Sequence, residues 1–277
     1  MSSELLVWWS ILCAATVINV AGWMVSARRL GVRRAQWPAD AYATRRLLLW
    51  LSAAYVLGCG FRSVLPMVEV PRICLHDVWI SRVAVTRSIA TVAEICFAAQ
   101  WALLLREAGA ATGSRIASLV SRLLVPIVVV AELFCWFAVL TANYLPHAIE
   151  NSQWALAGAL GVAAFIALWS RVGDAERRFL TAAIACGTGY VAFMAFVDVP
   201  MYLSRWQADL AAGREARPLL EGLPTALQRC VVQHEWAAWR EDAVWLSLYF
   251  TAAVWISIAL VHAPPPQRAL PSKDCYG

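Results

Sequence analysis

Apolar residues along this chain gather in seven long runs, and short polar segments separate them. Each run holds about 20 residues, the length that an α-helix needs to cross the hydrocarbon core of a bilayer. The pattern predicts spans at residues 5–26, 47–67, 83–105, 122–144, 153–171, 178–200 and 242–262. We therefore expect an all-α, polytopic membrane bundle of seven transmembrane helices, with residues 1–277 forming a single domain.

Composition supports this prediction. Hydrophobic residues make up 61% of the chain and charged residues only 15%, whereas a soluble domain carries about 25% charged residues. Many of the 15 tryptophans, such as Trp50 and Trp101, stand near the ends of the apolar runs, where an indole ring favours the headgroup region. We expect a multi-pass protein of the plasma (inner) membrane, with the lipid bilayer as its first partner.

Arginines predict the orientation of the bundle. The link after the first span holds six of them against a single acid, namely Arg28, Arg29, Arg33, Arg34, Arg45 and Arg46 against Asp40. The links after the third and fifth spans and the C-terminal tail are also basic. These segments share one side of a seven-span model, and short basic loops stay in the cytoplasm. The N-terminus is then expected outside and the C-terminus inside.

Two longer segments are expected on the outer face. One is the loop at 68–82, and the other is segment 201–241, whose scattered leucines and tryptophans suggest amphipathic helices lying over the bundle. Cys74 and Cys230 fall in these segments and are candidates for a disulfide, because an outer compartment is oxidising. The proline-rich tail at 264–277 is expected to be disordered.

Acidic residues inside two of the spans are the main candidates for chemistry. Glu94 and Glu132 each follow a Val-Ala pair near the middle of a span, where an unpaired charge costs several kcal/mol. Arg87 and Glu94 share a helical face, and adjacent antiparallel spans bring the two glutamates to similar depth. We predict a catalytic cluster of Glu94, Glu132 and Arg87 that can hold one shared proton. The alternative is that these charges only fix the packing of the helices.

Polar side chains at the outer ends of spans form a second candidate set. We expect Arg62, Asn143, Asp198 and Tyr202 to line a substrate pocket above the glutamates. Three histidines of the outer half each have an acid nearby: His76, His147 and His234. Histidine and carboxylate ligands suit a divalent metal, which is the candidate cofactor. The three come from separate segments, so solvated loop groups are the alternative.

Several classes of function are excluded or disfavoured. No basic run is interleaved with aromatic residues, which argues against nucleic acid as a partner. The only lysine is Lys273, in the tail, so a retinal Schiff base inside the bundle is excluded. The motifs point to no known family.

Three functions remain in competition. The first is an enzyme or binder with an outward-facing polar pocket for a lipid or other lipophilic ligand. The second is a small proton-coupled transporter that uses Glu94 and Glu132. The third is a non-enzymatic sensor or membrane-complex subunit, in which segment 201–241 would dock a protein partner or a second copy of the chain.

Overall fold

The computed structural model describes residues 1–228 and 230–264. The predicted disordered tail at 264–277 lies outside the described residues, apart from Pro264. The helices are α1 Ser3–Val32, α2 Ala39–Val64, α3 Val83–Thr112, α4 Arg115–Thr141, α5 Tyr144–Trp169, α6 Asp174–Phe193, α7 Val199–Ala211, α8 Leu219–Ala226, α9 Arg240–Phe250 and α10 Ala252–Leu260. Three short strands complete the regular structure: β1 Met67–Val68, β2 Ile73–Cys74 and β3 Val231–Val232.

The described residues contain seven helices that are long and apolar enough to cross a membrane. Five of these spans are single helices, α1 to α5. The sixth span, Glu176–Ala211, runs through α6 and α7, and the seventh, Arg240–Leu260, runs through α9 and α10. The predicted all-helical bundle of seven spans is confirmed, and its composition is consistent with an integral, multi-pass membrane protein.

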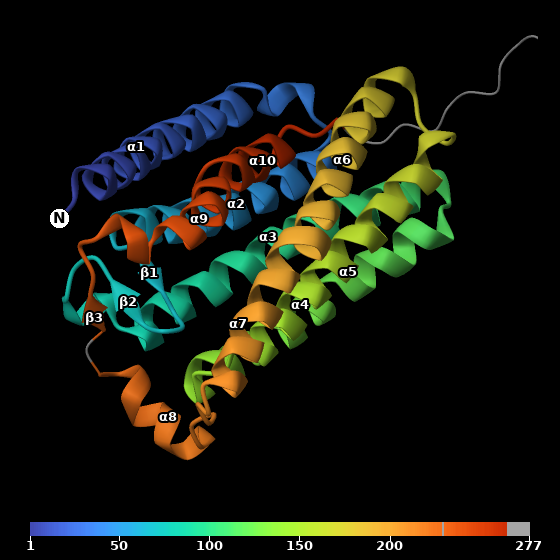
Figure 1. The fold of residues 1–277 in the computed structure, drawn as a ribbon. Helices are drawn as coiled ribbons and strands as arrows, with labels where there is room; N and C mark the ends of the chain where they lie inside the picture. Colours follow the sequence, from blue (N-terminus) through green and yellow to red (C-terminus); the bar gives the residue numbers. More distant parts are fainter. Residues whose placement is uncertain (229, 265–277) are drawn as a thin grey trace, which may run out of the picture.

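Consecutive helices lie against one another from α1 to α6, and α9 and α10 return to pack against α1 and α2 (Figure 1). The bundle has two distinct ends. The strands and α8 lie at one end, which we name the disulfide end (Figure 1). The links 33–38, 113–114 and 170–173 lie at the other, which we name the arginine end.

Local sequence signals set the antiparallel pair of α3 and α4. Gly113 ends α3 with a positive φ of 68°, a conformation that glycine adopts without a steric cost. Ser114 then begins α4, and its side-chain oxygen accepts a hydrogen bond from the backbone N–H of Ala117 at 3.3 Å. A serine at this position satisfies an N–H that lacks a partner within the helix. The chain therefore reverses within two residues.

The sixth span differs from its prediction. We expected the span to end at Pro200 and an amphipathic segment to follow from 201, but helix continues to Ala211. Residues Met194–Asp198 form a π-helical turn, and Pro200 falls in the first turn of α7. Proline has no N–H to donate, and here it follows directly on the π-helical turn, where the hydrogen-bond pattern of the helix changes. The proline therefore lies inside a continuous helical span instead of ending it.

The part of segment 201–241 that follows α7 is linked to the loop at 68–82 by strand pairing and a disulfide. β1 and β2 pair antiparallel, and β3 joins β2 in parallel, so a three-stranded sheet connects the two segments. Cys74 of β2 and Cys230, which directly precedes β3, form a disulfide with 5.8 Å between their Cα atoms. Both cysteines are buried.

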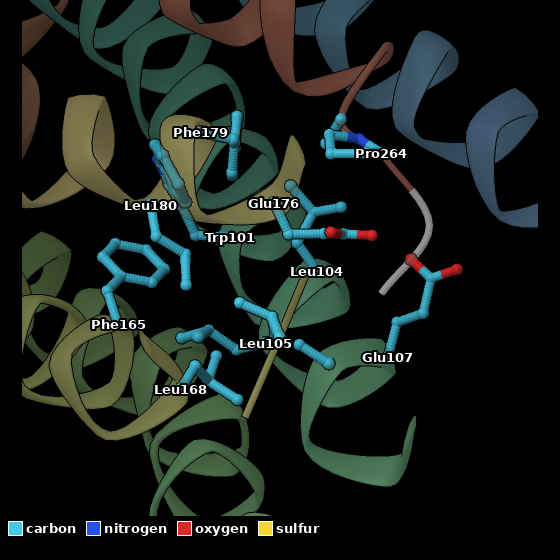
Figure 2. A pocket seen from close by; sticks show the side chains of 13 residues that line it. Trp101, Leu104, Leu105, Glu107, Phe165, Leu168, Glu176, Phe179, Leu180 and Pro264 are labelled. Carbon is cyan, nitrogen blue, oxygen red and sulfur yellow. The ribbon is translucent and has the colours of Figure 1, made fainter. Parts of the chain in front are cut away.

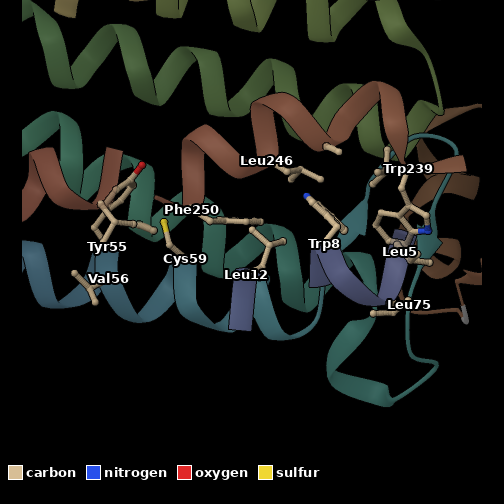
Figure 3. Close-up of a cluster of buried hydrophobic side chains, with 14 of the residues drawn as sticks. Leu5, Trp8, Leu12, Tyr55, Val56, Cys59, Leu75, Trp239, Leu246 and Phe250 are labelled. Atoms are coloured by element: carbon tan, nitrogen blue, oxygen red, sulfur yellow. The ribbon is translucent and has the colours of Figure 1, made fainter. Parts of the chain in front are cut away.

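A buried apolar cluster joins α1, α2 and α9 and includes Val68 of β1 and Ile73 of β2 (Figure 3). Leu5, Trp8 and Leu12 of α1 meet Leu246 and Phe250 of α9 there. Asn19 lies deeper on α1 and donates from Nδ2 to the Phe250 carbonyl at 2.8 Å. The last span is thus held against the first.

Candidate functional site

Arg87 stands at the centre of a buried group of charges between α3 and α4. Its Nη2 atom lies 2.7 Å from Oε2 of Glu94 and 2.6 Å from Oε2 of Glu132. All three side chains are buried. The predicted cluster is therefore brought together on a single guanidinium nitrogen.

The helices explain why these residues meet. Arg87, Thr91 and Glu94 follow one another at steps of four and three along α3, which places them on one face. The short turn at Gly113 and Ser114 makes α4 antiparallel, so Glu132 returns to the same depth. α2 lies close behind, since a Cβ placed at Gly58 would stand 2.8 Å from the Cβ of Ala93. Small residues permit such close approach between membrane helices.

Neighbouring hydroxyl groups donate hydrogen bonds to the carboxyl groups of Glu94 and Glu132, and an indole group donates to one of these hydroxyls. Thr91 donates from Oγ1 to Oε2 of Glu132 at 2.6 Å, and accepts from Nε1 of Trp136 at 3.1 Å. Tyr249 of α9 donates its hydroxyl to Oε1 of Glu94 at 2.9 Å. Among the described residues, Oε1 of Glu132 is buried without a hydrogen-bond partner.

Glu69 belongs to the same group, although its position in the sequence does not mark it. It follows β1, and its carboxylate lies 3.1 Å from Nη2 of Arg62 and 3.5 Å from Nη1 of Arg87. Burial alone would raise the pKa of Glu69, but the Arg87 and Arg62 guanidinium groups outweigh it and hold this pKa below its usual value. The signal in the sequence is weak, because Glu69 resembles an ordinary loop residue.

His147 connects this group to α5. Its Nδ1 atom lies 2.8 Å from Oε2 of Glu150, one turn further along the helix. The Sγ atom of Cys135, on α4, lies 3.9 Å from the same Nδ1 and 3.9 Å from Oε2 of Glu69. All of these side chains are buried.

We use the term charge cluster for the seven buried residues Arg62, Glu69, Arg87, Glu94, Glu132, His147 and Glu150. Its four carboxyl groups face two guanidinium groups. With every carboxyl ionised and His147 neutral, two negative charges would remain without a counter-charge. An uncompensated buried charge is costly. Bound protons or a cation are therefore needed to neutralise the two excess negative charges of the cluster.

The four residues predicted to line a substrate pocket lie in different surroundings. Arg62 pairs with Glu69, as described above, and Asn143 begins α5 by accepting a hydrogen bond from the N–H of Leu145 at 2.9 Å. Asp198 is buried in the π-helical turn. The ring of Tyr202 lies 5.1 Å from the ring of His147, so Tyr202 borders the charge cluster.

The three predicted metal histidines do not come together. The His76 ring packs against Trp9 with 5.3 Å between ring centroids, and Nε2 of His234 lies 3.1 Å from the carbonyl oxygen of Leu75. Within residues 1–228 and 230–264, the groups of three potential metal ligands include His147 but neither of these two histidines.

An open groove of about 420 Å³ lies at the disulfide end. Tyr144 lines it, together with Arg205, whose guanidinium pairs with Asp242 at 3.2 Å. The Tyr144 ring lies 6.3 Å from that of Tyr202, which in turn contacts His147. Contacts therefore run from the groove to the charge cluster.

Toward the arginine end, aromatic side chains fill the bundle, in contrast to the open groove at the disulfide end. Aromatic rings pack below the cluster. Tyr55 and Phe97 stack with 4.6 Å between ring centroids, and Trp101 and Phe165 lie tilted to each other with 5.5 Å between centroids. A small apolar cavity of about 40 Å³ lies further down and is lined by Trp101 and Phe165 among others (Figure 2). Neither this cavity nor the groove is lined by Glu94 or Glu132.

No family model, curated protein or solved structure matches this chain. The fold and the site therefore define its class directly. It is an α-helical bundle of the kind that integral membrane proteins form, and it encloses an acid-rich polar cluster.

Proposed function

We propose that this chain is an integral membrane enzyme that uses Glu94 and Glu132 for acid–base chemistry on a lipid or other lipophilic substrate. The disulfide end faces outward and the C-terminus lies in the cytoplasm. Two features support this orientation: basic links gather at the arginine end, and a disulfide persists in an oxidising compartment.

The observation that carries the proposal is the sharing of Nη2 of Arg87 by two carboxyl groups. One guanidinium balances one carboxylate, so the second carboxyl holds a proton instead of a charge. A carboxylic acid beside a carboxylate supplies both a proton donor and a proton acceptor. Such a pair performs general acid–base catalysis when a substrate reaches it.

The position of the groove favours an enzyme over a transporter. The groove at the disulfide end contacts the cluster through Tyr202 and His147. Toward the arginine end, the Tyr55–Phe97 stack separates Glu94 from the cytoplasmic side. A carrier needs a path to both faces in turn. A substrate that enters from the outer leaflet would need to displace side chains around Tyr202, since the groove itself stops short of the carboxyl pair.

The proposal is tested by incubating the purified full chain in vesicles made from a total membrane lipid extract. Untargeted mass spectrometry then compares the wild type with Glu94→Gln and Glu132→Gln. We expect at least one lipophilic species to be converted by the wild type and unchanged with either variant. Glu107→Gln is the matched control, because Glu107 forms its ion pair with Arg45 at the arginine end.

Unchanged lipid pools with the wild type would contradict the enzymatic proposal. Proton flux across the vesicle membrane, lost in the same two variants, would support the transporter instead. Conversion that persists in both glutamine variants would show that the reaction occurs elsewhere in the molecule.

A further inference from the structure

Cys135, His147 and Glu150 form a compact set of metal-ligating groups beside the Arg87 pair. Their ligand atoms all lie within 4.8 Å of one another. The thiol of Cys135 lies 3.9 Å from Nδ1 of His147, which lies 2.8 Å from Oε2 of Glu150. Each side chain is buried, so none of the three is a solvated surface group.

These donors suit a particular class of ion. A thiolate, an imidazole and a carboxylate together favour zinc and similar divalent transition metals over magnesium or calcium, which prefer oxygen alone. Around a tetrahedral zinc ion, neighbouring donor atoms stand about 3.5 Å apart. The distances of 3.9 Å and 2.8 Å bracket this value, and the third separation, between Cys135 and Glu150, is within 4.8 Å.

Rigid elements hold the three ligands. Cys135 lies in the last two turns of α4, and His147 and Glu150 stand at positions i and i+3 of the first turns of α5. Only the short turn at Ala142 and Asn143 separates the two helices. Ligands on packed helices keep their positions better than ligands on loops.

A second observation points to a bound cation. Oε1 of Glu132 is buried without a hydrogen-bond partner among the described residues, and the Glu132 side chain is 3% exposed. Glu132 and Glu150 belong together to another group of carboxylates with ligand atoms within 4.8 Å. An oxygen without a partner and an excess of negative charge beside the three ligands favour a bound cation in this region.

We propose that the chain binds one zinc-type divalent metal ion through Cys135, His147 and Glu150. In the metal-free cluster the His147–Glu150 pair holds one proton more than a neutral imidazole and a carboxylate carry. Binding releases this proton and the thiol proton of Cys135 to solvent, and the imidazole keeps its remaining proton on Nε2. The two charges of the ion compensate the new thiolate and one of the two unbalanced carboxylates. One proton then remains to be shared by Glu94 and Glu132.

This inference does not rest on the proposed reaction, because metal binding is measured without a substrate. It does place a metal beside the acid–base pair of the proposed function. A metal in this position would polarise an oxygen of a bound substrate. Loss of metal binding with retained lipid conversion, or the reverse, therefore separates the two proposals.

The test uses the full chain purified in detergent without a polyhistidine tag. After removal of metals by a chelator, Zn²⁺ is titrated and the bound ion is counted by elemental analysis. We expect one tightly bound zinc per chain, and at least about a tenfold loss of affinity in Cys135→Ser and His147→Gln. His76→Gln and His234→Gln are the matched histidine controls and should bind zinc like the wild type.

Cobalt provides a readout that does not depend on the variants folding. Co²⁺ bound to the wild type should give the near-ultraviolet charge-transfer band of a cobalt–thiolate bond, together with strong visible bands of tetrahedral coordination. No stoichiometric metal, or a cobalt spectrum without the thiolate band, would overturn the proposal. Equal loss of zinc in the His76→Gln and His234→Gln controls would overturn it too.

Discussion

Glu94 and Glu132, on neighbouring antiparallel helices, place their Oε2 atoms 2.7 Å and 2.6 Å from the same nitrogen of Arg87. Two carboxyl groups so close to one nitrogen are themselves near neighbours, and like charges at that range repel strongly. The arrangement is stable if one of them is protonated. The structural and the functional predictions both follow from this relationship.

Replacing Arg87 by methionine should destabilise the protein strongly. The change keeps an apolar stem of similar length but leaves Glu94, Glu132 and Glu69 without a shared counter-charge. Removing one partner of a buried ion pair costs about 3–5 kcal/mol. Unfolding by denaturant in detergent measures the loss. Arg177→Met is the control, because its pair with Asp174 is exposed, and a loss no larger than in this control would contradict the account.

The changes in stability caused by glutamine at Glu94 and at Glu132 should not be additive. Glutamine resembles a protonated carboxyl, so either single change removes the repulsion and leaves one carboxylate for Arg87. The double change removes both carboxylates that bond to Nη2. We expect the double variant to be less stable than the sum of the singles predicts, by about 0.5–3 kcal/mol. Additivity within experimental error would mean that the two residues do not share a proton and a partner.

Breaking the disulfide should loosen the disulfide end. The Cys74–Cys230 bond closes a loop across a sequence separation of 156 residues, and removing a native disulfide costs about 2–5 kcal/mol. We expect Cys74→Ser to lower the unfolding temperature and to speed proteolysis around residues 212–218. Cys186→Ser is the control, since Cys186 is a free, exposed cysteine. Equal behaviour of the two variants would show that the sheet alone holds this segment.

Acidification should weaken the arginine end through His262. Burial lowers the pKa of His262, and the charges of Arg33, Arg29 and Arg45 lower it further. Because the pKa is lower in the fold than the ordinary value of about 6.5, the unfolded chain takes up the proton first. Stability is therefore full above about pH 6.5 and falls as the pH drops below it.

Unfolding measured at a series of pH values between 7.5 and about 5 checks this prediction. In His262→Gln the loss over this window should be smaller, because glutamine does not titrate and can still bond to Ser26, which lies 2.7 Å from Nε2 of His262. The low pKa of Glu69 affects stability at lower pH than His262 does. The stabilisation by ionised Glu69 is lost only as the pH falls below about 4.5. Identical pH profiles for the variant and the wild type would contradict the role of His262.

Cysteine labelling should report the orientation of the bundle. Ala35 at the arginine end and Ala216 at the disulfide end are both exposed, so Ala35→Cys and Ala216→Cys form a matched pair. With an impermeant maleimide on intact cells, we expect Ala216→Cys to react and Ala35→Cys to react only after permeabilisation. The opposite pattern would reverse the proposed topology.

The sequence is sufficient to predict the spans and the α3–α4 pair, because apolar length and helical spacing are local properties. Arg87 and Glu94 could be placed on one face by counting residues, and Glu132 by the short turn between the helices. The apolar pattern predicts span 6 only to residue 200, whereas the helix continues to Ala211, because the polar residues of its last turns interrupt the apolar run.

The remaining members of the site depend on tertiary contacts. Glu69 reaches the cluster because the chain folds back after β1, and Tyr249 reaches Glu94 because the last span returns beside α2. Neither contact has a periodicity or a spacing that marks it. The His147–Glu150 pair follows from helical spacing, whereas its approach to Cys135 depends on the angle between α4 and α5.

Infrared difference spectroscopy detects the proton that Glu94 and Glu132 share. The purified protein at neutral pH is compared with Glu94→Gln, Glu132→Gln and the Glu107→Gln control. The account predicts a carbonyl stretching band of one protonated carboxyl, which shifts in D₂O, persists in the control and disappears in at least one of the two site variants. Absence of this band in the wild type, or its persistence in both site variants, would contradict the account.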